Sequence, residues 1–544
     1  MGVKGRYLCR AFKCTIGYAT GCHHHRMGNC RYKNFQKIKI KPIFVTKPVN
    51  PPNLSVMNRK PTFLLTLLIT VVCTDVFSQP MPQNGIYSVK TFGAKGDGTT
   101  LDSKAINKAI ESASDAGGGT VYLPAGNYLS GSIRLKSNIT LYLDQGATII
   151  ATSENPGDVY DQAEETANTT YQDYGHSHFH NSLIWGEDLH DVSILGPGMI
   201  WGKGLINDYK KDSKVANKAL TLYKCRNVII RDVTFLHAGW FAILATGVDN
   251  LTIDNLKMDT NRDGMDIDCC RNVRVSNCSV NSPYDDGICL KSTYALGFAR
   301  ATENVTITNC QVSGYDEGSF LDGTYKRTEN QHYGLHPTGR IKFGTESNGG
   351  FKNIAITNCV FDYCRGLALE AVDGALLEDV EINNITMRDI VNAPIFLRLG
   401  ARMRAPEGTP VGEIRRVSIS NVRIYNGDAD QACIITGIPG HAIKDVDLNN
   451  IRIYFKGGGK AQDAKVPELE KNYPEPSMFG TTAAYGFYIR HVDGLKLKDV
   501  EVSYLNEDVR PAFVMDDVKG LDSHNVKGQT VKGVQEIMYL NTDH

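Results

Sequence analysis

Three copies of one phrase decide the fold: RNVIIRDVTF at 226–235, DNLTIDNLKM at 249–258 and RNVRVSNCSV at 271–280. The asparagine at the second position of each copy recurs after 23 and then 22 residues. Each step contains short runs that alternate apolar and polar residues, separated by Gly, Asn or Asp, with almost no helical periodicity. A period in the twenties built of strands alone predicts a parallel β-helix, in which each coil buries its side chains against the next.

Further copies of the phrase extend the repeat towards the carboxyl end, first as ENVTITNCQV at 303–312 and KNIAITNCVF at 352–361. Cys278, Cys310 and Cys359 fall at the same place in three copies. A repeated position is a stacked one, so we expect these cysteines to be buried as small hydrophobes. Weaker copies begin at residues 378, 415, 444 and 498.

One segment before the repeats has helical periodicity, with apolar residues on one face at Ile106, Ala109, Ile110 and Ala113 and a stop at Gly117–Gly119. A solenoid needs its first coil covered, so we expect this helix to cap the amino-terminal end. Asn-x-Thr triplets that could accept glycans begin at Asn138, Asn250, Asn304 and Asn384. Because three of the four lie within repeat phrases or strands, we interpret them as turn residues instead.

The amino-terminal region differs in composition from the rest. Residues 1–56 hold eleven Lys or Arg and no Asp or Glu, and at Met57 a second beginning appears, with a basic MNRK, an apolar run and a small-residue cleavage site after Ser78. We interpret 57–78 as a secretory signal peptide, and Cys73 as less fitting for a lipoprotein anchor. Residues 1–56 then form an over-extended start or a basic leader without assigned function.

Cleavage after Ser78 would leave a single β-helical catalytic domain at 79–528, a carboxyl-terminal tail at 529–544, and a secreted or periplasmic protein. The remaining chain has 46 basic and 58 acidic residues, a net charge of 46 − 58 = −12. This charge argues against global steering of nucleic acid or another polyanion, so local cations must hold any anionic substrate. Nine of the fourteen cysteines remain, and this odd number argues against a disulfide framework.

Three carboxylates recur at the interval of the repeat. Asp285 and Asp286 are adjacent in SPYDDGICLKS, and Asp263 in TNRDGMDID lies 22 residues earlier. Neighbouring coils are about 4.8 Å apart, so all three acids are expected in one patch. Crowded carboxylates raise at least one pKa, and a separated acid and base are what glycosidic cleavage requires. A single aspartate at this place could be an ordinary turn residue of a β-helix. Three together favour a catalytic function.

The two motifs together resemble a known family. NRDGMDID at 261–268 and YDDGICLKS at 284–292 are similar to the paired aspartate motifs of glycoside hydrolase family 28, the polygalacturonases and their relatives. VKTFGAKGDGTT at 89–100 and the segment at 117–133 are similar to the amino-terminal coils of that family. The resemblance covers roughly residues 86–520 and implies a right-handed parallel β-helix with no cofactor or metal.

The resemblance also implies roles for the acids in an inverting, single-displacement hydrolysis. Asp285 would be the general acid that protonates the leaving oxygen, and Asp263 and Asp286 would together activate water. The implied substrate is a pectic polysaccharide or oligosaccharide with α-linked galacturonic acid, either polygalacturonan or rhamnogalacturonan.

The chain departs from the family pattern where cations hold the substrate carboxylate. TGRIKFGTES contains an Arg-x-Lys, formed by Arg340 and Lys342, but it lies one coil before the coil in which the family carries this motif. In that later coil the two positions of the motif hold Ala368 and Glu370. Arg340 and Lys342 share strand parity, so both can point to one face and bind a carboxylate, or else line a solvated strand face.

Two further substrate-binding candidates are weaker. Lys291, in CLKS, matches a lysine common in the family, and His336 lies three residues before Gly339, where the family has a glycine-flanked histidine. HSHFHN at 176–181 has metal-like spacing but no carboxylate cluster near it in sequence, so a plain loop is predicted.

Long insertions in the later coils predict a pocket closed at one end, hence action at chain ends, by a monomer. Two alternatives stay open: a β-helical polysaccharide lyase, which uses acids to hold Ca²⁺, and a non-catalytic glycan-binding β-helix. The sequence leaves the sugar and linkage undetermined.

Overall fold

The computed structural model describes residues 85–153, 159–164, 168–206, 216–328, 337–461 and 466–542. These all belong to one compact unit, Phe77–His544. The predicted leader, the signal peptide and His336 lie outside the described residues.

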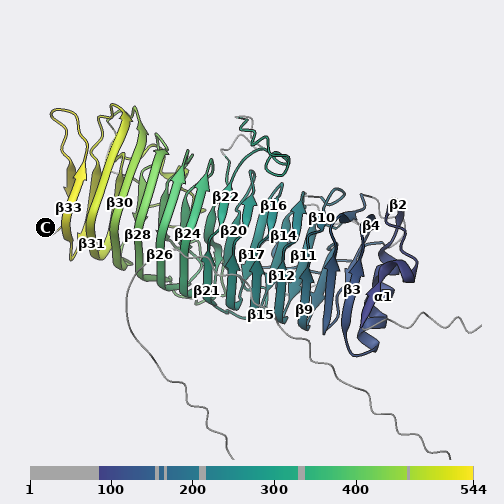
Figure 1. The fold of residues 1–544 in the computed structure, drawn as a ribbon. Helices are drawn as coiled ribbons and strands as arrows, with labels where there is room; N and C mark the ends of the chain where they lie inside the picture. Colours follow the sequence, from purple (N-terminus) through teal and green to yellow (C-terminus); the bar gives the residue numbers. More distant parts are fainter. Residues whose placement is uncertain are drawn as a thin grey trace, which may run out of the picture. The chain divides into compact units, whose positions relative to one another are not determined.

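The described strands pair in parallel into ladders, as the repeat predicts (Figure 1). The first ladder runs, in pairing order, through β5 (Ile133–Arg134), β8 (Ile184–Glu187), β11 (Lys218–Tyr223), β14 (Phe241–Thr246), β17 (Asp263–Asp268), β20 (Ile288–Ser292), β23 (Ile341–Ser347), β25 (Leu367–Ala371), β27 (Ile395–Leu399), β29 (Cys433–Thr436), β31 (Phe487–Asn506), β32 (Phe513–Lys519) and β34 (Ile537–Leu540).

The second ladder contains the repeat phrases. It runs through β1 (Ile86–Ser88), β3 (Gly119–Leu123), β6 (Ile139–Leu143), β9 (His190–Leu195), β12 (Arg226–Arg231), β15 (Asp249–Asp254), β18 (Arg271–Ser276), β21 (Thr302–Thr308), β24 (Phe351–Asp362), β26 (Leu376–Arg388), β28 (Glu413–Gly427), β30 (Ile443–Gly457), β31 and β33 (Asp522–Gly528).

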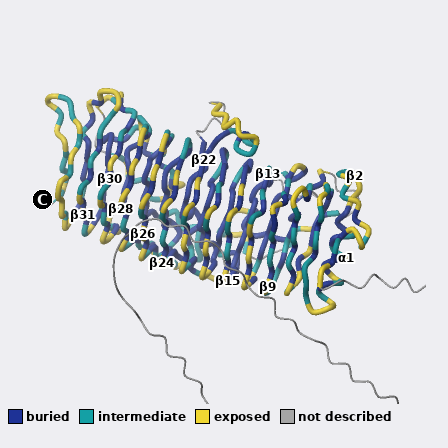
Figure 2. The backbone as a smooth tube through the Cα atoms, in the orientation of Figure 1, coloured by how far each residue is buried: buried dark blue, intermediate teal, exposed yellow. Residues whose placement is uncertain are grey.

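A third ladder of short strands joins the second at β24. It runs through β2 (Asp97–Leu101), β4 (Gly126–Ser130), β7 (Ala147–Ala151), β10 (Met199–Trp201), β13 (Thr234–Leu236), β16 (Lys257–Asp259), β19 (Ser279–Asn281) and β22 (Gln311–Ser313). Figure 2 shows buried residues running from coil to coil, with exposed ones gathered where strands turn.

Stacked asparagines explain why the repeat phrase keeps its second position. Asn250 donates its side-chain amide to Asn227 (2.9 Å), Asn272 to Asn250 (3.3 Å) and Asn304 to Asn272 (3.1 Å). Each of these residues has φ near +57°, in the left-handed region that Asn tolerates better than most residues. Of the four predicted turn asparagines, Asn138 precedes β6 and the other three lie within strands β15, β21 and β26, but all four have the left-handed φ typical of turns.

The cysteine prediction is confirmed, because all nine cysteines of the described residues are free and buried. The predicted helix forms as α1 (Ser103–Asp115), and the four predicted apolar residues are buried against the first coils (Figure 1). The solenoid continues past the predicted boundary at 528, because β34 pairs with β32. No helix among the described residues is long and apolar enough to cross a membrane.

The central strands of the first ladder, from β14 to β29, are buried on both faces, unlike those of the second ladder. All six residues of β17 are buried, whereas β18 alternates exposed and buried residues. The inner face of the first ladder joins the main core, and two smaller apolar clusters cover parts of its outer face. One cluster gathers around Trp240 and Phe241, and the other around Phe396 and Tyr488. Between them the outer face is polar and charged.

Candidate active site

The three predicted acids converge on the polar part of the first ladder. Asp263 begins β17, and Asp285 and Asp286 lie in the turn that precedes β20. Met265 pairs with Ile288, an offset of 23 residues, and Gly264 donates its backbone N–H to the carbonyl of Asp286 (2.9 Å). This register places Asp286 opposite Asp263, one residue beyond the Asp285 that the 22-residue interval suggested.

One carboxylate oxygen from each acid lies within 4.8 Å of the others. The side chain of Asp285 is 29% exposed, against 5% for Asp263 and 3% for Asp286. Arg262 sits beside the cluster, with Nε 3.0 Å from Asp285 Oδ2 and 3.9 Å from Asp263 Oδ2. Asp285 is therefore the member of the triplet that solvent, or a sugar, can reach.

The surroundings of Asp263 and Asp286 shift their pKa values in opposite directions. Burial, followed by repulsion from Asp285 and Asp266, raises the pKa of Asp263 well above its ordinary value. Burial also acts to raise the pKa of Asp286, but Lys342 and Arg340 outweigh it and hold that pKa far below the ordinary value. The sequence predicts a raised pKa through crowding alone, whereas burial is the larger cause here.

Arg340 and Lys342 point to the same side, as their parity predicts, and both contact Asp286. Arg340 Nε donates to Asp286 Oδ1 (2.7 Å), and Lys342 Nζ lies 3.4 Å from Asp286 Oδ2. Both cations are nearly inaccessible, with 3% and 2% exposed. The alternative of a solvated strand face is therefore wrong.

A loop at 466–480 covers these cations, and its side chains give no signal in the sequence beyond a Gly- and Pro-rich insertion. Glu475 accepts hydrogen bonds from Arg340 (3.0 Å) and from Asn392 (2.9 Å), and pairs with Arg365 (3.1 Å). Tyr473 accepts a hydrogen bond from Lys342 (3.4 Å). Sequence reasoning misses Glu475 because nothing in its spacing ties it to a strand more than 130 residues earlier.

Glu370, on β25, is a buried acid in this network. Its nearest cation is Lys342, 3.7 Å away, and neither of its oxygens has a hydrogen-bond partner among the described residues. Burial raises the pKa of Glu370 to about 7, against the opposing effect of Lys342. Lys342 pairs in register with Ala368, so the frame that places Ala368 and Glu370 one coil after Arg340 and Lys342 is confirmed.

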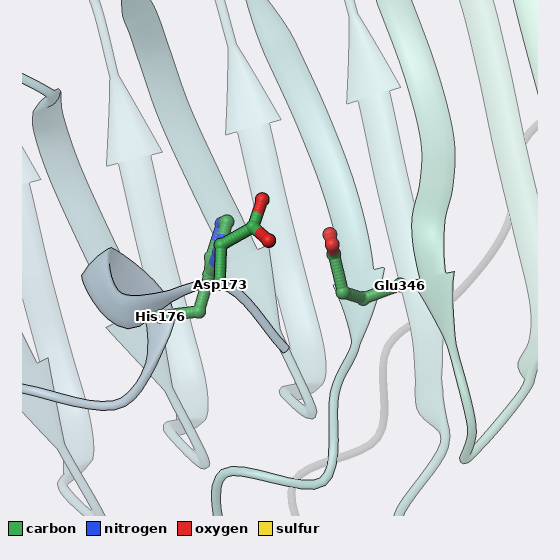
Figure 3. Close-up of side chains that lie close together, drawn as sticks. All are labelled: Asp173, His176 and Glu346. Carbon is green, nitrogen blue, oxygen red and sulfur yellow. The ribbon is translucent and has the colours of Figure 1, made fainter. Parts of the chain in front are cut away.

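The histidine segment lies closer to acids than its sequence suggests. His176, in a short 3-10 turn, donates a hydrogen bond from Nε2 to Oδ2 of Asp266 (2.9 Å) and lies close to Asp173 and Glu346 (Figure 3). The segment is a loop, as predicted, but the expectation that no carboxylates accompany it is wrong, because β23 brings Glu346 across from a distant part of the chain.

Cations already neutralise the acids of this second cluster. Lys291 Nζ lies 3.2 Å from Glu346, and Arg404 lies 3.0 Å from Asp173 and 3.6 Å from Glu346. A divalent ion would have to compete with both cations. Lys291, predicted to bind substrate, is thus 6% exposed and paired within the protein.

A surface cavity of about 750 Å³ lies elsewhere, and none of the residues that line it belongs to either cluster. Its walls come from β7, β10, β13 and β16 and the adjoining turns. The carboxylate cluster is thus distinct from this cavity. The cluster combines an acid with a raised pKa, an anion held by two cations and a more accessible carboxyl group, with one oxygen of each within 4.8 Å of the others.

Comparisons with known proteins concern the fold and the family resemblance. A family model described as rhamnogalacturonase A/epimerase, pectate lyase-like, matches residues 86–183, and one described as right-handed β-helix region matches 211–332. A probable polygalacturonase of Vitis vinifera is 26% identical over 389 residues, which cover 62% of this chain and 74% of that protein. The chain is therefore similar to polygalacturonases, at low identity.

Two other comparisons bear on fold and on the lyase alternative. A family 28 exopolygalacturonase structure from Yersinia enterocolitica has a TM-score of 0.59 at 19% identity, covering 81% of this chain and 78% of that one. It shows the shared fold, a right-handed β-helix. Alginate lyase 7 of Azotobacter vinelandii is 48% identical over 73 residues, which cover only 12% of this chain and 8% of the lyase.

Proposed function

We propose that the protein is a glycoside hydrolase that cleaves pectic glycans containing α-linked galacturonic acid. The observation that carries the proposal is the convergence of Asp263, Asp285 and Asp286 from neighbouring coils, with opposite pKa directions for the two buried acids. Separated protonation states are what acid- and base-assisted cleavage of a glycosidic bond needs.

In the proposed reaction Asp285 donates its proton to the leaving oxygen, because it is the accessible acid. Water attacks the anomeric carbon and loses a proton to Asp286, assisted by Asp263. Asp263, whose pKa burial raises, supplies the proton that Asp285 passes to the leaving oxygen, and the Asp263 carboxylate that remains can then assist Asp286.

The stereochemistry of the reaction rests on the family resemblance. Inverting carboxylate pairs are typically about 6.5–9.5 Å apart, and retaining pairs about 5–5.5 Å. The nearest oxygens here are within 4.8 Å, so their spacing alone does not support inversion. We propose inversion, and proton NMR of the first-formed product anomer checks it.

Action at chain ends is supported by the segments around the cluster. The loop at 466–480 lies over Arg340 and Lys342, and Arg404 ties a second loop to the segment that carries Asp173 (3.0 Å). Segments on several sides of a site favour a pocket over an open groove.

The lyase alternative is favoured by the 73-residue likeness to alginate lyase 7 and by the pectate lyase-like family model at residues 86–183. A lyase of this architecture needs acids free to bind Ca²⁺. Asp286 is already held by Arg340 and Lys342, which weakens the case for such an ion. Chelator-sensitive turnover with an unsaturated product would establish the lyase.

The test is incubation of the purified full-length protein with polygalacturonan, rhamnogalacturonan and their oligosaccharides, followed by chromatography of the products. We expect a single small product that accumulates from the start. A ladder of products would overturn action at chain ends, and no cleavage of any pectic glycan would overturn the proposed function.

We also propose export through the segment at 57–78, and a monomeric catalytic unit. Fractionation of cells that express the intact gene should place the protein outside the cytoplasm, with Ser78 as the last residue removed. Light scattering of the purified protein measures its oligomeric state.

A further inference from the structure

The chain builds a carboxylate-binding pocket and fills it with its own side chain. Glu475 lies against Arg340 with both oxygens, at 3.0 Å and 3.4 Å, and its Oε1 also meets Arg365 (3.1 Å) and Asn392 (2.9 Å). Two guanidinium groups and an amide around one carboxylate are what a bound uronate would be expected to find. In this structure the carboxylate of Glu475 occupies that place.

The other cations around the site are paired as well. Lys342 lies 3.4 Å from Asp286, Arg262 3.0 Å from Asp285, and Lys291 3.2 Å from Glu346. Farther along the outer face, Arg402 donates to Asp373 (3.0 Å). Each of these cations therefore already has a carboxylate partner from the protein itself.

The covering loop is held too firmly for a substrate to displace Glu475 readily. Val466, Leu469 and Phe479, on either side of Glu475, pack in the apolar cluster that also contains Phe396 and Tyr488. A tethered carboxylate acts at an effective concentration of about millimolar or more, and it competes with a substrate carboxylate of the same chemistry. Breaking a buried charge pair adds a further penalty.

Glu370 adds a repulsive element. It lies one coil beyond Arg340 and Lys342, is fully buried, and leaves both oxygens without a hydrogen-bond partner among the described residues. An acid in this position disfavours a second carboxylate nearby.

We propose that the sugar bound on the Arg340–Lys342 side of the cleaved bond is neutral, and that Glu475 determines this specificity. The inference rests on the proposed function, since it names the sugar class at that same site. In a pectic glycan with alternating neutral and acidic sugars, the site would accept a neutral unit here and leave the acidic unit on the far side of the bond.

The test compares two oligosaccharides with the full-length protein: trigalacturonate, and a rhamnogalacturonan oligosaccharide that ends in rhamnose. We expect kcat/KM for the rhamnose-ended substrate to exceed that for trigalacturonate by about tenfold or more. Glu475→Gln should narrow this ratio by about tenfold, because it frees Arg340 and Arg365 for a uronate. Glu470→Gln, the same change in the same loop, should leave the ratio unchanged.

The wild-type ratio needs no variant, so it decides the sugar class even where Glu475→Gln fails to fold. Preferred release of galacturonate by the wild type overturns the inference and leaves the proposed function standing. A neutral preference that Glu475→Gln does not alter, in a variant with a wild-type melting transition, overturns the role of Glu475. Cleavage of neither substrate, nor of any other pectic glycan, overturns the proposed function itself.

Discussion

The second ladder and the first ladder run side by side in every central coil, yet they stack different kinds of residue. In β12, β15 and β18 the asparagine and the inward apolar positions recur from coil to coil, so asparagine stacks on asparagine. In β17, β20 and β23 the outer row changes identity from coil to coil, from Asp266 to Cys289 to Lys342.

The difference shows that one side of the solenoid specifies the fold and the other specifies the chemistry. Identical stacked residues make each coil interchangeable with its neighbour. Unlike residues in a buried row put acids beside bases, and burial then amplifies their mutual effects on pKa. Variants on the first ladder should therefore change activity and pH dependence, and variants on the second should change stability alone.

The largest expected effect is on turnover. Asp285→Asn removes the proposed general acid, so kcat should fall by about 10²–10⁴-fold on whichever pectic glycan the wild type cleaves. Reducing-end assays measure the loss. Asp522→Asn on β33, an exposed aspartate of the second ladder, is the matched control. Full activity of Asp285→Asn would remove Asp285 from the mechanism.

Asp286→Asn should cost both activity and stability, because it leaves Lys342 and part of Arg340 buried without their partner. Loss of one member of a buried pair typically destabilises by about 3–5 kcal/mol. The folded-state pKa of Asp286 is depressed, so its stabilising contribution is present above the unfolded pKa and lost as pH falls below about 4.

Denaturant unfolding at pH 7 and below pH 4 checks this prediction. The stability gap between Asp286→Asn and the wild type should narrow in acid. A gap that stays constant with pH would contradict the assignment of Asp286 as a fixed anion.

Glu370→Gln tests a pH dependence of stability that has the opposite sign to that of Asp286. The folded-state pKa of Glu370 is about 7, above its ordinary 4.5, so its favourable contribution is present below pH 4.5 and is lost as pH rises towards 7. Relative to Glu370→Gln, the wild type should lose up to about 3 kcal/mol over this interval. Melting curves at pH 5 and pH 7.5 measure the change, and equal pH slopes for the two proteins would contradict it.

The smallest effect is expected on the second ladder. Asn272→Ala removes the amide links to Asn250 and Asn304 and places alanine at φ 57°, which should destabilise by about 1–2 kcal/mol without changing kcat. Asn272→Gly relieves the backbone strain but not the lost links. A fall in kcat that is larger than the unfolded fraction of the variant explains would contradict the assignment of stability alone to the second ladder.

The repeat made most of the fold predictable. Residues such as Asn250 and Cys278 recur once in each coil because every coil packs against a similar neighbour, and the capping helix follows from the need to cover the first coil. The sequence does not predict that the β-helix continues past residue 528, because the last strand, β34, lacks the repeat phrase.

The site was predictable only where it follows the coil. Asp263 lies one coil before the adjacent Asp285 and Asp286, so the period of the repeat predicts that the three lie together. Glu475, Asn392 and His176 reach the same face through loops and through coils far away in sequence, and no periodicity connects them. The parity of Arg340 and Lys342 gave their direction but not their partners.

The most direct test of the central claim is cleavage in water labelled with heavy oxygen, followed by mass spectrometry of the products. Hydrolysis by the Asp263–Asp285–Asp286 cluster predicts one labelled oxygen at each new reducing end, turnover that is unchanged by a chelator, and loss of both label and product in Asp285→Asn. Unlabelled products with an unsaturated end, formed only without chelator, would contradict it.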